Sequence, residues 1–173
     1  MVSYSCGWHG PLEAFLCVDE RNWESHLLLH HQSCALEPAA DSQRCAWHNC
    51  FLALREQLRD LGDAYIIFEY ELPRERGRRP DVVILICGTV LVLEFKDHRT
   101  AHRAHIDQVA AYARDLRHYH AASHLAAVVP VLVLTGSLDP PTTFEDVTVV
   151  GPKDLSAAIA RIIGADKGTA IIP

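Results

Sequence analysis

The chain has 173 residues, enough to bury a sizeable hydrophobic core, and its apolar fraction of 49% and charged fraction of 22% exclude wholesale disorder. Its formal net charge of −6 argues against a protein that coats nucleic acid through its overall field. No apolar run reaches the roughly 18 residues of a membrane span, and the first ten residues lack a signal-peptide pattern, so we expect a cytoplasmic protein with no membrane partner.

The first third of the chain has the weakest periodic pattern. It predicts helical segments near residues 11–18 and 23–34, and we expect residues 1–44 to form a helical extension packed on a main domain of residues 45–173. Residues 43–61 are predicted to form an amphipathic helix, because apolar side chains recur there at steps of three and four residues. These side chains are Trp47, Phe51, Leu54, Leu58 and Leu61.

The rest of the chain alternates between strand and helix patterns. Nearly continuous Val, Ile and Leu in the second and third predicted strands indicates burial on both faces of a sheet. The expected elements are strands 64–72, 81–86 and 89–96, helix 101–120, strands 128–134 and 147–150, and helix 152–163. Their order, helix, three strands, helix, strand, predicts an α/β fold with a mixed sheet and a helix on each side.

A short loop sets the pairing of the second and third strands. If residues 87–88 form a two-residue hairpin loop, with its glycine in the left-handed conformation, Ile86 pairs with Thr89. Counting back along both strands then puts Asp81 opposite Glu94. Directly opposite residues have Cβ atoms about 4.5–5.5 Å apart, and like charges there destabilise a sheet unless a cation neutralises them.

Asp81, Glu94 and Lys96 are therefore expected on one patch, since alternate side chains of a strand share a face. Mg²⁺ or Mn²⁺ prefers carboxylate and water oxygens, and such an ion polarises a phosphodiester and activates a water nucleophile. A nearby lysine orients that water or stabilises the charge that develops on the phosphate. The alternative interpretation is structural, because an Asp after Pro is commonly a turn residue and Glu-Phe-Lys at a strand end is commonly a solvated edge.

The same residues resemble the signature of the PD-(D/E)xK nuclease superfamily. Pro80-Asp81 corresponds to its first half and Glu94-Phe95-Lys96 to its second, and Gln108 and Tyr112 match the Gln-x3-Tyr element of its RecB-type branch. The resemblance implies a restriction-endonuclease-like α-β-β-β-α-β core and a metal-dependent DNA nuclease. It also implies that Gln108 and Tyr112 support the metal site or contact the DNA backbone. The alternative for this pair is a helix whose tyrosine packs in the core.

The superfamily often adds an acidic residue from its first helix to the metal site. Glu56 is the candidate that the resemblance implies, and Glu69 and Glu71 in the first predicted strand are its rivals. Glu56 is equally suited to face solvent as a partner of Arg55 or Arg59.

Short stretches elsewhere resemble a narrower group. Met1–Ser5, Ala46-Trp47 and Phe68–Pro73 are similar to the N-terminal nuclease-like domain of certain bacterial superfamily 1 helicase-like proteins, some of them suspected in defence against foreign DNA. This resemblance implies a helicase or other ATPase as a partner or fused domain. The chain itself contains no Gly-x4-Gly-Lys-Ser/Thr nucleotide-binding motif.

Basic residues flank the predicted site on both sides in the sequence. We expect them to bind a DNA backbone, with an affinity that falls steeply as salt rises. They are Arg76, Arg78, Arg79, Arg99 and Arg103. Three alternatives stay open: RNA as the substrate, a DNA-binding or regulatory module that keeps the fold without catalysis, and a homodimer in place of a monomer.

Cysteine and histidine residues form several short patterns. The six cysteines are expected to be reduced thiols. Cys-x2-His pairs are weaker zinc signals than Cys-x2-Cys pairs, so buried thiols and helix-surface histidines are the preferred interpretation. The patterns are Cys6 with His9, His30 and His31 with Cys34, and Cys45 with His48 and Cys50. His98, His102 and His105 flank the predicted site and are candidates for phosphate contact.

Overall fold

The computed structural model of the chain describes residues 6–35, 37–72, 77–119 and 126–165. The strands are β1 (Trp8–Pro11), β2 (Ala64–Phe68), β3 (Val82–Ile86), β4 (Thr89–Lys96), β5 (Ala127–Leu134), β6 (Thr142–Phe144) and β7 (Val147–Val150). The helices are α1 (Leu12–Cys17), α2 (Glu20–Cys34), α3 (Asp41–Gln57), α4 (Arg103–Tyr119), the 3-10 turn η2 (Pro152–Asp154) and α5 (Leu155–Ala165).

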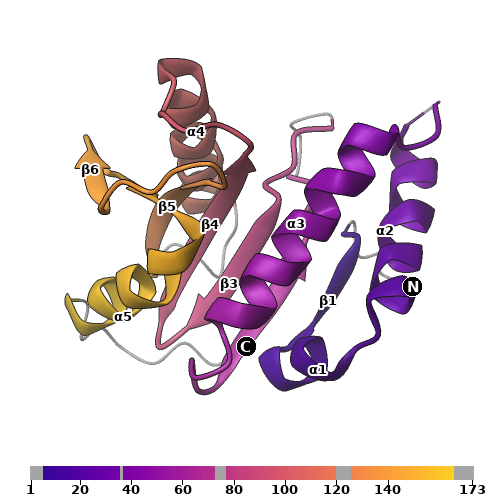
Figure 1. Cartoon of the computed structure of the whole chain (residues 1–173), viewed down its shortest axis with the longest axis horizontal. Helices are drawn as coiled ribbons and strands as arrows, with labels where there is room; N and C mark the ends of the chain where they lie inside the picture. Colours follow the sequence, from indigo (N-terminus) through magenta and orange to yellow (C-terminus); the bar gives the residue numbers. More distant parts are fainter. Residues whose placement is uncertain (1–5, 36, 73–76, 120–125, 166–173) are drawn as a thin grey trace.

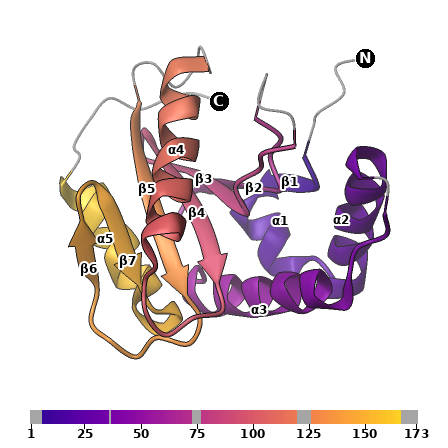
Figure 2. The same cartoon turned by 90° about the horizontal axis from the view of Figure 1, so that it is seen from above.

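The strands form one mixed sheet in the order β1-β2-β3-β4-β5-β7-β6 in the described part of the chain. Helices α3 and α5 lie on one face of this sheet and α4 lies on the other (Figure 1, Figure 2). The predicted α/β class is confirmed, and α3, β2, β3, β4, α4 and β5 follow the predicted order of helix, three strands, helix and strand.

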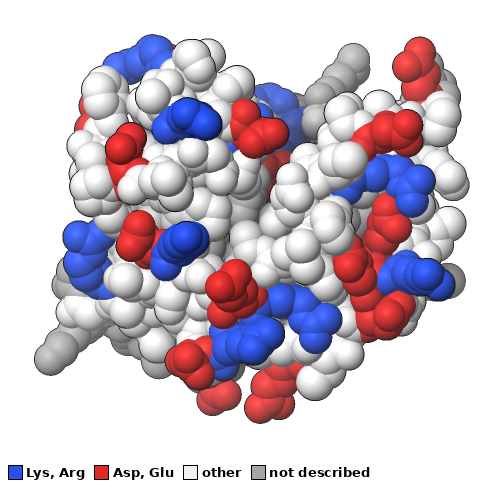
Figure 3. Space-filling model, viewed as in Figure 1, with Lys and Arg blue, Asp and Glu red and all other residues white. Residues whose placement is uncertain are grey.

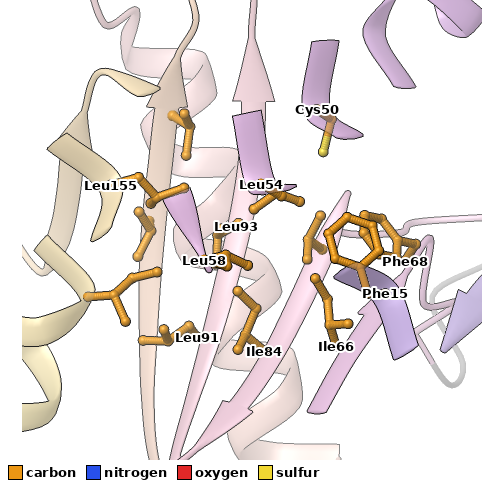
Figure 4. Close-up of a cluster of buried hydrophobic side chains, with 14 of the residues drawn as sticks. Phe15, Cys50, Leu54, Leu58, Ile66, Phe68, Ile84, Leu91, Leu93 and Leu155 are labelled. Carbon is orange, nitrogen blue, oxygen red and sulfur yellow. The ribbon is translucent and has the colours of Figure 1, made fainter. Parts of the chain in front are cut away.

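Two hydrophobic cores lie on opposite faces of the sheet because strand side chains alternate. Leu91 and Leu93 of β4 belong to the larger core, together with Leu54 of α3 and Leu155 of α5 (Figure 4). Val92, which lies between the two leucines, belongs to the core under α4. Strand β4 is therefore buried on both faces, as its aliphatic sequence predicts.

The β3–β4 hairpin has the predicted register. Cys87 and Gly88 form its loop with φ of 47° and 80°, and Ile86 pairs with Thr89. Both loop residues take the left-handed conformation that two-residue hairpins favour. Strand β4 is antiparallel to β3 on one edge and parallel to β5 on the other, so the strand that carries Glu94 is held from both sides.

Strand β2 is shorter than predicted. It ends at Phe68, and Glu69 follows with a φ of 52°, which takes the backbone out of the extended conformation before the predicted end at residue 72. Strands β1 and β6 are additional to the prediction. Strand β1 pairs antiparallel with β2 at one end of the sheet, and β6 pairs with β7 at the other.

The segment before α3 is part of the main core. Phe15 and Trp23 belong to the same buried cluster as Leu54, and β1 extends the sheet, so this segment is not only helical as predicted. The predicted boundary after residue 44 falls inside α3. Within the described residues, no helix combines the length and apolar character that crossing a membrane requires.

Candidate active site

Asp81 and Glu94 lie side by side where β3 begins and β4 ends. Val82 pairs with Leu93, so the next residues along the two strands, Asp81 and Glu94, are directly opposite. Asp81 Oδ2 accepts a hydrogen bond of 2.7 Å from the backbone N–H of Phe95, which ties the side chain to the neighbouring strand. Only 2% of the Glu94 surface is exposed. The structure thus brings the two carboxyls together as the hairpin register predicted.

Lys96 and Gln108 both contact Glu94. Lys96 Nζ lies 2.8 Å from Glu94 Oε1, and Gln108 Nε2 donates to the same oxygen at 2.8 Å. Burial lowers the pKa of Lys96, but Glu94 and Asp81 outweigh burial and the pKa is raised overall, so the side chain is a charged ammonium. Helix α4, which carries Gln108, covers this face of the sheet (Figure 2).

Tyr112 lies one helical turn after Gln108. Gln108 Nε2 lies 2.8 Å from the Tyr112 hydroxyl, to which it donates. The tyrosine ring is also buried in the core under α4. Both interpretations of the sequence therefore describe part of the side chain: the ring packs in the core, and the hydroxyl takes part in the polar network around Glu94.

The site holds more negative charge than its own cations neutralise. Burial raises the pKa of Asp81 well above its ordinary value; Glu94 and Glu69 raise it further, while the Phe95 N–H and Lys96 act in the opposite direction. Burial also raises the pKa of Glu94 despite the contact with Lys96. Glu94 Oε2 is buried and has no hydrogen-bond partner among the described residues. Because an unpaired buried polar atom is costly, a further cation would stabilise this arrangement.

Glu69 is the third carboxylate near this pair. Its backbone N–H donates to the Asp81 carbonyl at 3.0 Å, and its side-chain Oε1 accepts a 2.8 Å hydrogen bond from Trp47 Nε1. Arg79 Nε lies 3.6 Å from Glu69 Oε2. The sequence predicted Trp47 only as a core residue. The signal for its second role is chemical, since a buried indole N–H usually has an acceptor.

Glu56 does not join this group. It is exposed on α3 and lines a groove with Asp19 and Arg55. It follows Trp47 by nine residues, which at 3.6 residues per turn places it on the opposite side of the helix. The geometry fits the solvent-facing interpretation of Glu56, and its predicted place in the metal site gains no support from it.

The donor set around Asp81 suits a hard cation. Among the described residues, no group of three or more His, Cys, Asp or Glu side chains is arranged so that it could hold a metal ion. Asp81, Glu94 and the unpartnered Glu94 Oε2 nevertheless offer the carboxylate oxygens that Mg²⁺ and Mn²⁺ bind together with water. Burial, followed by the charges of Asp81, Glu69 and Glu94, raises the pKa of the Cys50 thiol well above its ordinary value, so Cys50 adds no thiolate. The residues present therefore fit Mg²⁺ or Mn²⁺.

Two of the predicted basic residues lie beside the site. Arg78 Nη1 is 3.2 Å from Asp115 Oδ2, and its guanidinium carbon is 5.2 Å from the centre of the Tyr112 ring. Arg79 contacts Glu69, and its Nη1 is buried without a hydrogen-bond partner among the described residues. The Arg78 guanidinium therefore lies next to Tyr112, and the Arg79 guanidinium lies next to Glu69.

Arg99 and Arg103 are exposed on the surface. Arg103 forms exposed ion pairs with Asp107 at 2.8 Å and Glu145 at 2.9 Å. Arg99 is exposed and lines a groove with Thr142. Arg76 lies outside the described residues. On the face shown in Figure 3, acidic and basic side chains are interspersed, and the surface is hollowed between the side that carries α4 and the side that carries α3.

Three histidines cluster next to Lys96. The ring centres of His98, His102 and His105 are 5.0–5.3 Å apart, and the rings of His98 and His105 are stacked. Burial, followed by the charge of Lys96, lowers the pKa of His105. The cluster therefore presents imidazoles beside the site, and their predicted contact with phosphate stays a prediction.

Comparisons with known proteins give a limited picture. No protein-family model and no curated protein matches the chain. One similar solved structure is described as the refined half-complex from a tetradecameric assembly of Thermococcus gammatolerans McrB AAA+ hexamers with bound McrC; the identity is 17% and the TM-score 0.46. The match covers 87% of this chain and 42% of that chain, so this chain spans less than half the length of the one it matches. A likeness at this level assigns neither a family nor an activity.

Proposed function

We propose that the chain is a Mg²⁺- or Mn²⁺-dependent nuclease that hydrolyses phosphodiester bonds of DNA. The observation that carries this proposal is the buried Asp81–Glu94 pair, with Lys96 on the same face and one Glu94 oxygen without a partner. Structural turn residues or a solvated strand end would not be expected to stay buried with a carboxylate oxygen that has no partner. The resemblance to PD-(D/E)xK nucleases rests on these same residues.

The side chains of the site have distinct tasks in this proposal. Asp81 and Glu94 would hold the cation, which supplies Lewis-acid polarisation of the phosphate and a water of lowered pKa. Lys96 places a fixed positive charge where charge develops on the scissile phosphate. Gln108 fixes the orientation of the Glu94 carboxylate, because the Gln108 amide donates to Glu94 Oε1. The same amide also donates to the Tyr112 hydroxyl. No covalent enzyme intermediate is required.

A cleavage assay tests the proposal. Linear, nicked and single-stranded DNA, with matched RNA, are incubated with the full chain in Mg²⁺, Mn²⁺ or chelator. We expect cleavage of DNA only with metal, and loss of cleavage in Asp81→Asn and Lys96→Ala. Lys153→Ala is the matched control, because this lysine is exposed on η2. Equal cleavage by wild type and both site variants would contradict the proposal, and preferred cleavage of RNA would change the substrate.

A non-catalytic DNA-binding module is the second candidate. It is favoured by the Lys96 ammonium and Gln108 amide, which both already occupy Glu94 Oε1. This candidate predicts DNA binding that does not depend on Glu94 or on metal. For either candidate, a helicase or other ATPase is the proposed partner, and pull-down with the tagged full chain tests it.

A further inference from the structure

We infer that Glu69 is the third carboxylate of the metal site, in the place for which the superfamily resemblance suggested Glu56. The inference rests on the proposed metal-dependent function and adds a residue to its site. It is carried by the pairing of three strands, by the contacts that hold the Glu69 side chain, and by the balance of charge around it.

The three carboxylates stand in one row across adjacent strands. Phe68 pairs with Val82, and Val82 pairs with Leu93. One position beyond these pairs lie Glu69, Asp81 and Glu94, one from each strand in turn. The Glu69 N–H donates to the Asp81 carbonyl at 3.0 Å, which continues the pairing by one residue. Asp81 and Glu94, directly opposite each other, have Cβ atoms about 5 Å apart. Glu69 has left the extended conformation, with a φ of 52°, and its link to the row is the backbone hydrogen bond to Asp81.

The Glu69 side chain is held from outside the row. Trp47 Nε1 donates to Glu69 Oε1 at 2.8 Å. Helix α3 therefore supplies an indole that orients the Glu69 carboxylate, where the resemblance implied that it supplies a carboxylate. Arg79 Nε stands 3.6 Å from Oε2, which is beyond ordinary hydrogen-bond length, so Arg79 lowers the cost of the buried charge without saturating that oxygen. Only 8% of the Glu69 surface is exposed. Such contacts are typical of a ligand whose position is fixed before the ion arrives.

The charge balance needs Glu69. Lys96 and Arg79 would by themselves offset the two carboxylates Asp81 and Glu94, and a site balanced in this way has little attraction for a divalent cation. Glu69, held by Trp47 and Arg79 next to Asp81, adds the negative charge that makes the row acidic. The unpartnered oxygen of Glu94, a residue only 2% exposed, is the independent sign that the row can accept a cation.

Mn²⁺ titration of the metal-stripped full chain tests the inference without measuring activity. Calorimetry should show that Glu69→Gln weakens Mn²⁺ binding about tenfold or more, in the range found when groups around a metal are removed. The control is Glu56→Gln, which also removes one negative charge but does so at the exposed Glu56 of α3, the helix that carries Trp47. This variant should bind Mn²⁺ as wild type does. Equal affinity of Glu69→Gln and wild type overturns the inference, and so does a loss of affinity in Glu56→Gln as large as that in Glu69→Gln.

A second variant covers the outcome in which Glu69→Gln does not fold, which circular dichroism reveals. Trp47→Phe keeps all the carboxylates and removes only the donor to Oε1, and it should weaken Mn²⁺ binding about tenfold; unchanged affinity overturns the inference. Glu94→Gln separates this inference from the proposed function. If wild type binds no Mn²⁺, or Glu94→Gln binds it as tightly as wild type, the metal site and with it the proposed function fail. If binding depends on Glu94 but not on Glu69, only the present inference fails.

Discussion

Replacing Asp81 with Asn should make the metal-free protein more stable while it removes the proposed activity. The substitution deletes one of three neighbouring carboxylates and keeps a side-chain oxygen that can accept the Phe95 N–H. It removes the interactions of Asp81 with Glu94 and Glu69, which raise its pKa, and with Lys96, which lowers it. Proteins commonly hold such like charges together only where a ligand neutralises them.

The magnitude follows from the register. Two unit charges about 5 Å apart interact by about 3 kcal/mol at an effective dielectric constant of about 20. If the attraction to Lys96 cancels one of the two repulsions, about 3 kcal/mol remains, and exchange of a charge-assisted for a neutral hydrogen bond at the Phe95 N–H subtracts about 1–1.5 kcal/mol. We expect the variant to be about 1.5–2 kcal/mol more stable, which raises Tm by about 3–8 °C for a chain of this length.

The gain should depend on pH. Burial, then Glu94 and Glu69, raise the pKa of Asp81 in the folded state. The stability that this group contributes to the wild-type chain is therefore fully present below its unfolded pKa of about 3.9. That stability is lost as the pH rises through the folded pKa. The advantage of Asp81→Asn is therefore small near about pH 4 and larger near about pH 8.

Thermal unfolding in chelator across this pH range, followed by circular dichroism, measures the effect. Asp60→Asn, at an exposed aspartate, is the control and should shift stability by less than about 0.5 kcal/mol. Addition of Mn²⁺ to about 100 times its Kd should stabilise wild type by about 2.7 kcal/mol and reverse the order of the two proteins. A variant less stable than wild type in chelator, or a gain that is the same at every pH, would refute the reasoning.

Three further substitutions probe the site and the fold. Lys96→Met leaves the buried Glu94 without its ammonium and should lower the free energy of unfolding in chelator by about 3 kcal/mol in urea titrations; unchanged stability would mean that Glu94 is protonated there. Cys87→Asn should raise stability by about 0.5–1 kcal/mol, because asparagine tolerates the φ of 47° better, and a loss would show that the thiol packs usefully. Leu54→Ala, at a side chain with 0% exposure, should cost about 2–5 kcal/mol by calorimetry, whereas a cost below 1 would mean that the core closes around the cavity.

The part of the site on β3 and β4 could be predicted because local rules fix it. A two-residue loop with a glycine sets the register of a hairpin, and the register alone places Asp81 opposite Glu94. Side-chain alternation then puts Lys96 on the same face, and the one-turn spacing of Gln108 and Tyr112 puts both on one side of α4. Each step depends on residues that are close in the sequence.

Glu69 could not be chosen over Glu56 in the same way. Its position depends on the register between β2 and β3, and the 13 residues between these strands, 69–81, do not determine that register by length or by turn chemistry. The sequence also gives no warning that β2 ends at Phe68, because Glu69 and the residues after it continue the alternating pattern. Strands β1 and β6 are short and carry Gly10 or exposed threonines, so their composition does not distinguish them from loops.

Strand β4 pairs with β5 along all eight of its residues, and with β3 from Thr89 to Leu93. Because Leu93 is paired on both sides, its amide should exchange with deuterium mainly when the sheet itself comes apart. Loss of the Asp81–Glu94 arrangement on heating would then coincide with global melting. We expect no partly folded state to keep Asp81 and Glu94 together once this strand has left the sheet.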